Sequence, residues 1–195
     1  MREIDLVREL QSTGKAFFAL PDLEKVTGLE RRSLYVSLNR WLKKGVLERA
    51  AKGIYVIPGG GARVEVIAGQ LYFPCYLSFE SALYRAGVLN LVPYALTFAT
   101  TKKTRKATLL GREVLCRQIK GEFFFGFEIE DGLYVARAEK ALLDLIYMNT
   151  LGKASLPLAE MDFRSLSKPT LKKYARRFPS RVMKKLIGVL EGLEG

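Results

Sequence analysis

Residues 16–58 constrain the fold more than any other part of the chain, because helix and strand patterns follow one another there in a fixed order. Residues 20–27 suit a short helix that Gly28 ends, since glycine readily adopts the left-handed conformation found after a helix C-terminus. Residues 30–44 suit a longer amphipathic helix with apolar residues at i, i+4, i+7 and i+8. This stripe consists of Leu34, Leu38, Trp41 and Leu42. The order predicts two helices joined by a tight turn.

Two short alternating runs follow the second helix. Residues 46–50 and 53–57 are typical of a β-hairpin that turns around Ala51, Lys52 and Gly53. A helix over residues 3–12 and a short strand at Phe17 and Phe18 complete the pattern. The sequence therefore predicts a winged helix-turn-helix over residues 1–58, a shape that places one helix in the major groove of DNA.

The second helix of the pair has a basic, polar face opposite its apolar stripe. Arg and Asn side chains suit base edges in the major groove, whereas Lys and Ser side chains suit phosphates. The hairpin adds cations that can reach the DNA backbone or the minor groove. The predicted contacts are Arg31, Arg32, Ser33, Asn39, Arg40 and Lys43 on the helix, with Arg49 and Lys52 on the hairpin. The alternative is that these charges only solvate an exposed helix face.

The charge balance narrows the class of partner. The chain of 195 residues has 32 basic and 20 acidic residues, a formal net charge of +12. Such an excess favours nucleic acid or an anionic membrane surface. No apolar run reaches the roughly 18 residues that span a bilayer, and the N-terminus carries acidic residues, unlike a signal peptide. We therefore expect a cytoplasmic protein that binds nucleic acid and has no membrane partner.

Residue types that serve catalysis and metal binding are scarce. The chain has no histidine, which removes the commonest general base and metal ligand. Cys75 and Cys116 are far apart in sequence, so they form no zinc motif. They are predicted to be small buried apolar residues, although spacing alone leaves a disulfide open. We predict no metal, no cofactor and no catalytic residue.

A metal-dependent nuclease remains the enzymatic alternative, because carboxylates with a lysine can hold magnesium. The candidates are Glu80, Glu128, Glu130, Asp131, Glu139, Lys140 and Asp144. Glu139 and Asp144 are five residues apart, however, and do not share a helix face as a ligand pair would.

A Pro-Gly-Gly-Gly run at residues 58–61 marks the predicted boundary between domain 1–58 and domain 59–195. In the second domain, Ser78 is predicted to cap a helix. The predicted helices are 62–72, 79–86, 138–148, 170–177 and 180–193, and the predicted strands are 94–100, 107–110, 113–119, 122–129 and 134–136. The whole chain is thus α+β: a winged helix-turn-helix and then a mixed α+β domain with a helical C-terminal tail.

Two features of the second domain have alternative interpretations. The basic run at residues 100–106 is either a solvated loop or a second surface that contacts phosphates. In the second case its contacts are Lys102, Lys103 and Arg105. Four phenylalanines within residues 123–127 are predicted to be core residues of one strand. The alternative is that they stack on the bases of single-stranded nucleic acid.

Three stretches of the second domain resemble the AbiEi-like antitoxin family of type IV toxin–antitoxin systems, which act in abortive infection. They are YLSFESALYRAGVL (76–89), LTFATTKKTRKATLLGREVLCRQIKGEFFFGFE (96–128) and VARAEKALLDLIYM (135–148). The resemblance covers nearly the whole chain. Ala138 departs mildly from the family pattern, which has proline before the Glu-Lys-Ala-Leu-Leu-Asp element.

The resemblance implies an autoregulating transcriptional repressor that binds inverted repeats of double-stranded DNA in its own promoter. It also implies that the second domain counters a nucleotidyltransferase-like toxin without forming a stable complex with it. We accordingly predict a sequence-specific repressor that is not an enzyme. The alternative is that the second domain is the active part, as an antitoxin or a nucleic-acid-binding module, with repression secondary. The sequence leaves the oligomeric state open.

Overall fold

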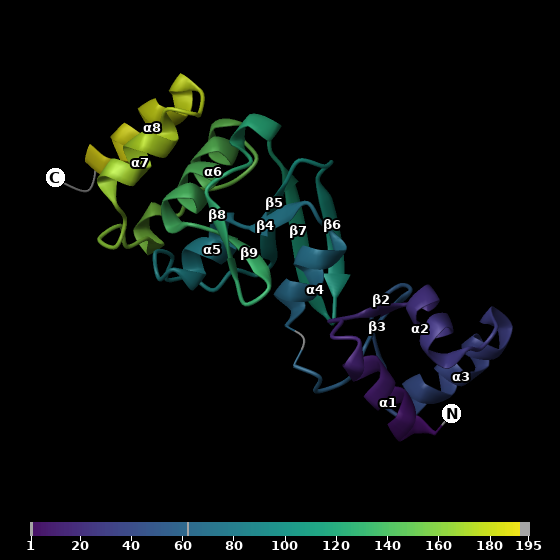
Figure 1. Cartoon of the computed structure of the whole chain (residues 1–195). Coiled ribbons are helices and arrows are strands. Elements are labelled where there is room, and N and C mark those ends of the chain that lie inside the picture. The colour runs from purple at the N-terminus through teal and green to yellow at the C-terminus, as the bar shows by residue number, and fades with distance from the viewer. Residues whose placement is uncertain (1, 62, 192–195) are drawn as a thin grey trace. The chain divides into compact units, whose positions relative to one another are not determined.

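The computed structural model describes residues 2–61 and 63–191, and it has an α+β fold (Figure 1). The chain forms two compact units. The first comprises Met1–Ala68 with Thr108–Arg112, and the second comprises Gly69–Ala107 with Glu113–Gly195. The domain boundary at residue 58 stays a prediction.

In its described part, the first unit contains three complete helices, the beginning of a fourth and a small antiparallel sheet. The complete helices are α1 (Glu3–Ser12), α2 (Leu20–Thr27) and α3 (Arg31–Lys43). The strands are β1 (Phe18–Ala19), β2 (Glu48–Ala51) and β3 (Ile54–Val56), in the order β1-β3-β2. The predicted helices over residues 3–12 and 20–27 and the predicted strand at Phe18 are confirmed, whereas Phe17 lies before β1.

The turn between α2 and α3 follows from local chemistry. Gly28 has φ 66°, the left-handed conformation predicted for it, and its N–H donates to the Glu24 carbonyl oxygen at 2.9 Å. At the other end of α2, Asp22 accepts a hydrogen bond from the Ala19 N–H at 2.8 Å. The polypeptide therefore ends one helix and begins the next within three residues.

The apolar stripe of α3 is the centre of the first unit's core. Leu34, Leu38 and Trp41 are almost fully buried, as the helical spacing predicted, and the other stripe residue, Leu42, is partly buried. They pack in one cluster with side chains from α1, β1, α2 and β3. That cluster also includes Leu6, Leu10, Phe18, Leu23, Leu47 and Tyr55. Burial of these side chains, at roughly 1.5–3 kcal/mol each, fixes α3 on the unit and leaves its opposite face exposed.

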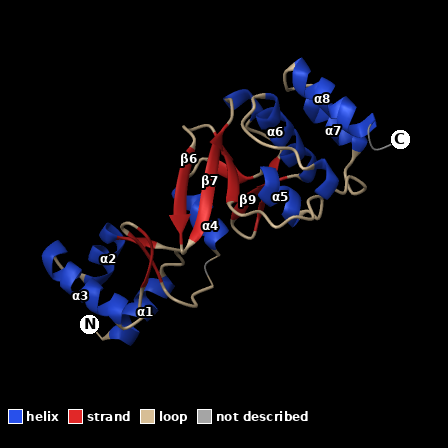
Figure 2. Ribbon diagram, turned by 180° about the vertical axis from the view of Figure 1, so that it is seen from behind, coloured by secondary structure: helices blue, strands red, loops and turns tan. Residues whose placement is uncertain are grey.

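The second unit is built on a six-stranded mixed sheet in the order β6-β7-β5-β4-β9-β8 (Figure 2). The strands are β4 (Cys75–Leu77), β5 (Leu96–Thr100), β6 (Arg105–Leu109), β7 (Arg112–Gln118), β8 (Phe127–Glu130) and β9 (Leu133–Ala136). Strand β4 pairs antiparallel with β5 and parallel with β9, so it is central to the sheet. The sequence patterns did not predict β4, because three residues are too few to show alternation.

Helices cover both faces of this sheet. The described helices are α4 (Val64–Leu71), α5 (Phe79–Arg85), α6 (Ala138–Thr150), α7 (Lys168–Ala175) and α8 (Ser180–Glu191). A Cβ on Gly69 of α4 would meet Phe98, whereas the neighbouring Thr97 bonds to Ser81 of α5. Because successive strand residues point to opposite faces, α4 and α5 lie on opposite sides. Accordingly, α4 crosses the strands in front in Figure 1 and behind in Figure 2.

Three predictions about the second unit were wrong in detail. Ser78 precedes α5 but makes no capping hydrogen bond, because its hydroxyl donates to Asp144 instead. The predicted strand over residues 122–129 is split into a 3₁₀ turn (η1, Gly121–Phe123), a loop and β8. Arg105 belongs to β6 rather than to the preceding loop.

The C-terminal helices agree with the predicted tail, and a second 3₁₀ turn (η2, Leu158–Glu160) precedes them. Helix α6 is two residues longer than predicted, and α7 begins at Lys168 and ends at Ala175 rather than spanning residues 170–177. The predicted end of the last helix, at residues 192 and 193, lies outside the described residues. Within residues 2–61 and 63–191, no helix has the length and apolarity needed to cross a membrane.

Candidate nucleic-acid interface

The exposed face of α3 carries the residues predicted from the helical spacing. Arg31, Arg32, Ser33, Asn39, Arg40 and Lys43 are all exposed. Val36, at the centre of the face, is 72% exposed, whereas Leu34 on the opposite face is fully buried. The helix sequence, RRSLYVSLNRWLK, contains no acidic residue. The face therefore combines cations, an amide, a hydroxyl and one small apolar side chain.

Most of these cations have no acidic partner. Arg31 Nε lies 3.2 Å from Glu24 Oε1 on α2, so part of its charge is compensated within the unit. Arg32, Arg40 and Lys43, by contrast, form no ion pair within the described part of the chain. Three uncompensated positive charges on one helix face form a local positive potential, which attracts an anionic partner.

The first turn of α3 carries cations where helices usually carry acidic residues. A helix N-terminus carries a partial positive charge, and acidic residues are the ones that stabilise it. Here the first turn contains Arg31 and Arg32 and no acidic residue, and the preceding Glu30 makes no capping hydrogen bond. An anion placed there would be attracted both by the exposed backbone N–H groups and by Arg32.

The β2–β3 hairpin supplies the remaining predicted contacts of the first unit. Arg49 is exposed on β2, and its guanidinium carbon lies 5.8 Å from the centroid of the Tyr55 ring. Lys52 is exposed in the turn, where Gly53 has φ 76°. The hairpin thus holds one cation against an aromatic ring and presents another at its tip.

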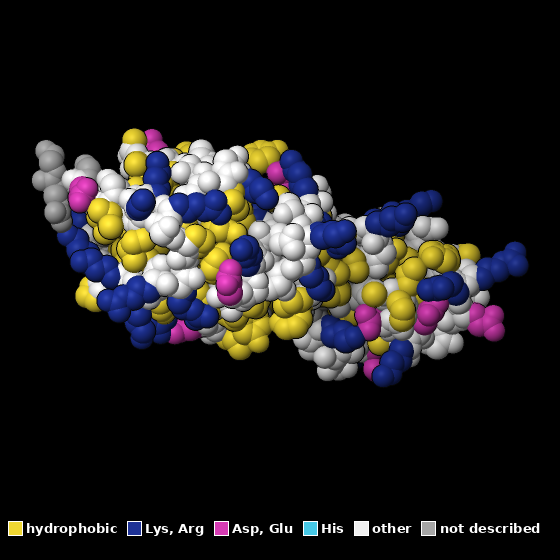
Figure 3. Space-filling view, turned by 90° about the horizontal axis from the view of Figure 1, so that it is seen from above, with side chains coloured by type: hydrophobic (Ala, Val, Ile, Leu, Met, Phe, Trp, Pro, Cys, Tyr) yellow, Lys and Arg dark blue, Asp and Glu magenta, His cyan; other side chains and the backbone are white. Residues whose placement is uncertain are grey.

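The predicted basic loop contacts belong to the second unit. Lys102 and Lys103 lie in the connection from β5 to β6, and Arg105 begins β6. All three side chains are exposed and line one small cavity. On the face of the molecule drawn in Figure 3, Lys and Arg side chains are scattered widely and outnumber the acidic ones. The structure therefore places Lys102, Lys103 and Arg105 around the same cavity.

A buried ionic cluster in the second unit was not predicted. Lys140 and Asp144, one turn apart on α6, are fully buried and form an ion pair. Lys140 Nζ also donates to Tyr76 Oη at 2.7 Å. The Asp144 carboxylate accepts hydrogen bonds from Tyr76 Oη at 2.9 Å and from Ser78 Oγ at 2.8 Å. The i, i+4 spacing of Lys140 and Asp144 was the available signal, but Tyr76 and Ser78 are more than 60 residues away in sequence.

The surroundings of this cluster explain the phenylalanine-rich run. Lys140 Nζ lies 5.0 Å from the centroid of the Phe125 ring and 5.3 Å from that of Phe178. Burial lowers the pKa of Lys140 and raises that of Asp144, while each charge opposes the effect on the other. Of the four phenylalanines only Phe123 is fully buried, so the prediction of one strand buried on both faces was wrong. The run instead closes over Lys140.

The carboxylates proposed for a nuclease do not form one site. Four of them have separate basic partners: Glu80 with Arg117, Glu128 with Arg137, Glu130 with Arg85, and Asp144 with Lys140. A fifth, Glu139, accepts a hydrogen bond from the Ser167 N–H at 2.9 Å. In the described residues, no three His, Cys, Asp or Glu side chains are arranged to hold a metal ion. The geometry gives the nuclease alternative no support.

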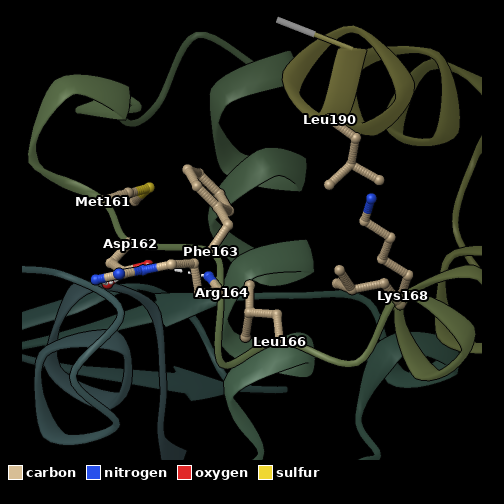
Figure 4. Close-up of a pocket in the computed structure, with 8 residues that line it drawn as sticks. Met161, Asp162, Phe163, Arg164, Leu166, Lys168 and Leu190 are labelled. Carbon is tan, nitrogen blue, oxygen red and sulfur yellow. Dashed lines mark hydrogen bonds and ion pairs between the residues drawn. The ribbon is translucent and has the colours of Figure 1, made fainter. Parts of the chain in front are cut away.

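A mostly apolar cavity lies between the segment that joins η2 to α7 and the last two helices (Figure 4). Its volume is about 350 Å³, and Met161, Phe163, Leu166 and Leu190 supply carbon surface. Its arginine, Arg164, is bound by Asp162, with Nε 3.0 Å from both carboxylate oxygens. That guanidinium is therefore neutralised by its neighbour.

The helix pair of the first unit and the basic face of α3 are consistent with a helix-turn-helix regulator. Residues 5–58 match the family described as "Transcriptional regulator, AbiEi antitoxin". The predicted family resemblance is confirmed over this stretch, which includes α2, α3 and the three-stranded sheet. The comparison with curated proteins gives no match. Over residues 59–195 the family resemblance stays a prediction.

Proposed function

We propose that the chain is a sequence-specific repressor that binds double-stranded DNA through residues 1–58 and acts as the autoregulating antitoxin of a type IV toxin–antitoxin system. The observation that carries this proposal is the face of α3, which is exposed, basic and without acidic residues. The AbiEi match over residues 5–58 supports a regulatory role. The order of helices and strands, with β2 and β3 after α3, supports a winged helix-turn-helix.

In this proposal α3 enters the major groove. Arg32 and Asn39 read base edges, because Arg can bond twice to guanine and Asn twice to adenine. Ser33, Arg40 and Lys43 hold the helix in register through phosphates, and the hairpin contacts the adjoining backbone. Repression follows from occlusion of the promoter and requires no cofactor.

Fluorescence anisotropy tests the proposal directly. The full chain is titrated with a labelled duplex taken from upstream of its own gene and with a shuffled duplex of the same composition, across a salt series. We expect a preference for the native duplex that persists as the salt concentration rises, since base contacts depend less on counterion release than phosphate contacts do. Equal affinity for both duplexes at every salt concentration would reject sequence-specific repression.

A second candidate places the antitoxin activity in the second unit, with repression secondary. The observation that favours it is charge, because residues 151–195 hold 10 basic and 4 acidic residues. The test uses the full chain with Arg32, Asn39 and Arg40 replaced by alanine, produced beside the cognate toxin from a promoter that the chain does not regulate. Growth rescue equal to that of the unmodified chain supports the candidate. Loss of rescue by the folded variant contradicts it.

A further inference from the structure

A small polar cavity lies beside the connection from β5 to β6. Its volume is about 180 Å³. Tyr72, just after α4, lines one side, and Cys116 of β7 contributes apolar surface. The connection itself contributes Thr100, Lys102, Lys103 and, at the start of β6, Arg105. Among the described residues that line this cavity, three are cationic and none is acidic. All of them belong to the second unit.

Hydrogen bonds hold the cationic loop in place at both ends. The Thr100 hydroxyl donates to the Pro74 carbonyl oxygen at 2.7 Å and accepts from the Lys102 N–H at 3.2 Å. At the other end, the Gln118 N–H donates to Thr104 Oγ1 at 3.0 Å. The backbone that carries these charges is therefore ordered before any ligand arrives, which lowers the entropy cost of binding.

The ammonium group of Lys102 is held by a backbone carbonyl oxygen distant in sequence, whereas Lys103 and Arg105 remain available. Lys102 Nζ donates to the Phe73 carbonyl oxygen at 2.6 Å, which fixes its ammonium group. The guanidinium carbon of Arg105 lies 5.6 Å from the centroid of the Tyr72 ring, a contact that orients the group. Neither Lys103 nor Arg105 forms an ion pair within residues 2–61 and 63–191.

The neighbouring Lys106, on the same strand as Arg105, is neutralised by an acidic partner. Its ammonium group lies 2.9 Å from Glu113 Oε2 on β7. The cavity has no equivalent carboxylate in its described lining. Like charges around one small cavity repel each other, and a bound anion relieves that repulsion.

We propose that this cavity binds a terminal phosphate or pyrophosphate group, with Lys103 and Arg105 as its charged ligands and Lys102 as a fixed cation beside them. The volume is below the roughly 300–1,000 Å³ of pockets that enclose a drug-sized ligand, so the phosphate enters and the rest of the molecule stays outside. A terminal phosphate carries a charge of about −1.5 to −2 and three acceptor oxygens, more than a backbone diester offers. Paired Lys and Arg donors suit that group.

The same chemistry occurs in a small phosphorylated molecule and at the 5′-phosphorylated end of a nucleic acid. The inference does not depend on DNA recognition by α3, because none of its residues lies in the first unit. Isothermal titration calorimetry of the full chain at low and at moderate salt uses pyrophosphate, ATP and single-stranded oligonucleotides with a 5′-phosphate or a 5′-hydroxyl. Amide NMR spectra of the complex locate the bound anion.

We expect saturable binding of pyrophosphate with shifts at Thr100 to Arg105, and at least tenfold weaker binding by the K103Q/R105Q variant. The matched control, K172Q/K173Q on α7, removes the same charge from two exposed lysines and should bind as the unmodified chain does. Preference for the 5′-phosphate over the 5′-hydroxyl oligonucleotide, with weak pyrophosphate binding, also supports the site and names nucleic-acid ends as its source. Absence of saturable binding, or equal loss in both variants, overturns the inference.

Discussion

Arg31 and Arg32 are adjacent at the start of α3, yet their environments differ. Arg31 contacts Glu24, and Arg32 has no ion-pair partner in the described chain. Arg32 also lies at the positive end of the helix, where a cation lowers stability by about 0.3–1 kcal/mol. Its presence there contributes nothing to the fold of the first unit that the structure shows. In the proposed function, Arg32 contributes to binding rather than to stability.

Replacing Arg32 by alanine should therefore separate binding from stability. We expect R32A to keep or slightly raise the melting temperature, since an unfavourable charge is removed. Its affinity for the operator duplex should fall by about 1–3 kcal/mol, and discrimination against the shuffled duplex should decrease. Anisotropy and thermal unfolding measure the two effects. Arg8, exposed on α1, provides the control variant R8A with the same charge change. If R32A and R8A bind equally well, α3 does not read DNA through Arg32.

Asp22 gives a pH-dependent prediction for the beginning of α2. Burial acts to raise its pKa, but the Lys15 ammonium and the Ala19 N–H outweigh it, so the pKa of Asp22 lies below 3.8. A depressed carboxyl pKa stabilises the folded state above the unfolded-state pKa, and this contribution disappears as the pH falls through the folded-state pKa. At pH 7, the free energy of unfolding of D22N should be about 0.5–1 kcal/mol lower than that of the unmodified chain. Urea unfolding at several pH values should show the difference shrinking as the pH falls below 3.8 and vanishing once the pH is below the folded-state pKa of Asp22. A constant difference at all pH values would reject this account.

The two cysteines should be inert in the folded protein. Both are buried and unpaired, as predicted for small apolar residues. Burial, with a smaller effect of Cys116, raises the pKa of Cys75 to about 12, and burial raises that of Cys116 to about 11. Because the thiolate is the reactive form, a disulfide reagent at pH 8 should modify neither thiol at a measurable initial rate. Addition of denaturant should release both. Rapid labelling of the native protein would show that the sheet opens readily.

Among the elements, helix α6 is held in position by a buried ion pair. Its Lys140 and Asp144 side chains are paired in the interior. Burying two charges is costly unless each is fully paired, and here Tyr76 and Ser78 complete the hydrogen bonding of Asp144. Removal of one partner should therefore cost more than removal of both.

We expect D144L to lower the free energy of unfolding by about 3–5 kcal/mol, because Lys140 is left buried and unpaired. The double variant K140M/D144L should lose clearly less. Circular dichroism during urea unfolding is the appropriate measurement, since the single tryptophan, Trp41, belongs to the first unit. K153M, at an exposed lysine after α6, controls for the loss of a charge. A double variant as unstable as D144L would show that the cluster is not an ion pair in solution.

The elements also show why some features were predictable and others were not. The stripe of Leu34, Leu38 and Trp41 lies within one helix, so its spacing predicted both the buried core and the exposed face. Ser78 looked like a helix cap because its sequence neighbours suit one, but its partner Asp144 lies 66 residues further along. The cavity beside Lys103 has the same origin, since Tyr72 and Cys116 reach it only through the sheet pairing. Local patterns predict helices well and contacts across a sheet poorly.

At the scale of the whole molecule, the net charge of +12 favours an anionic partner, and binding to such a partner weakens as the salt concentration rises. Each phosphate that a protein cation neutralises adds about 0.9 to the slope of log affinity against log salt concentration for duplex DNA. Removal of a contact to phosphate weakens binding to every sequence alike. Removal of a contact to a base changes the preference among sequences.

Lys52, at the tip of the hairpin, contacts phosphate in the proposed complex. K52Q should weaken binding to the operator and to the shuffled duplex by similar factors and lower the salt slope by about 0.9. Anisotropy over at least four salt concentrations gives both values. K153Q serves as the control, because Lys153 is exposed in the second unit. An unchanged slope for K52Q would place the hairpin away from the DNA backbone.

The two faces of α3 share no residue: one holds the core, and the other meets solvent. Side chains on the exposed face can therefore be exchanged without disturbing the packing beneath them. A library of variants at Arg32, Val36, Asn39 and Arg40 should retain folded protein across most of its members while sampling many operators. In the proposed function, this scaffold acquires a new DNA target by changes on a single helix surface, without passing through unfolded intermediates.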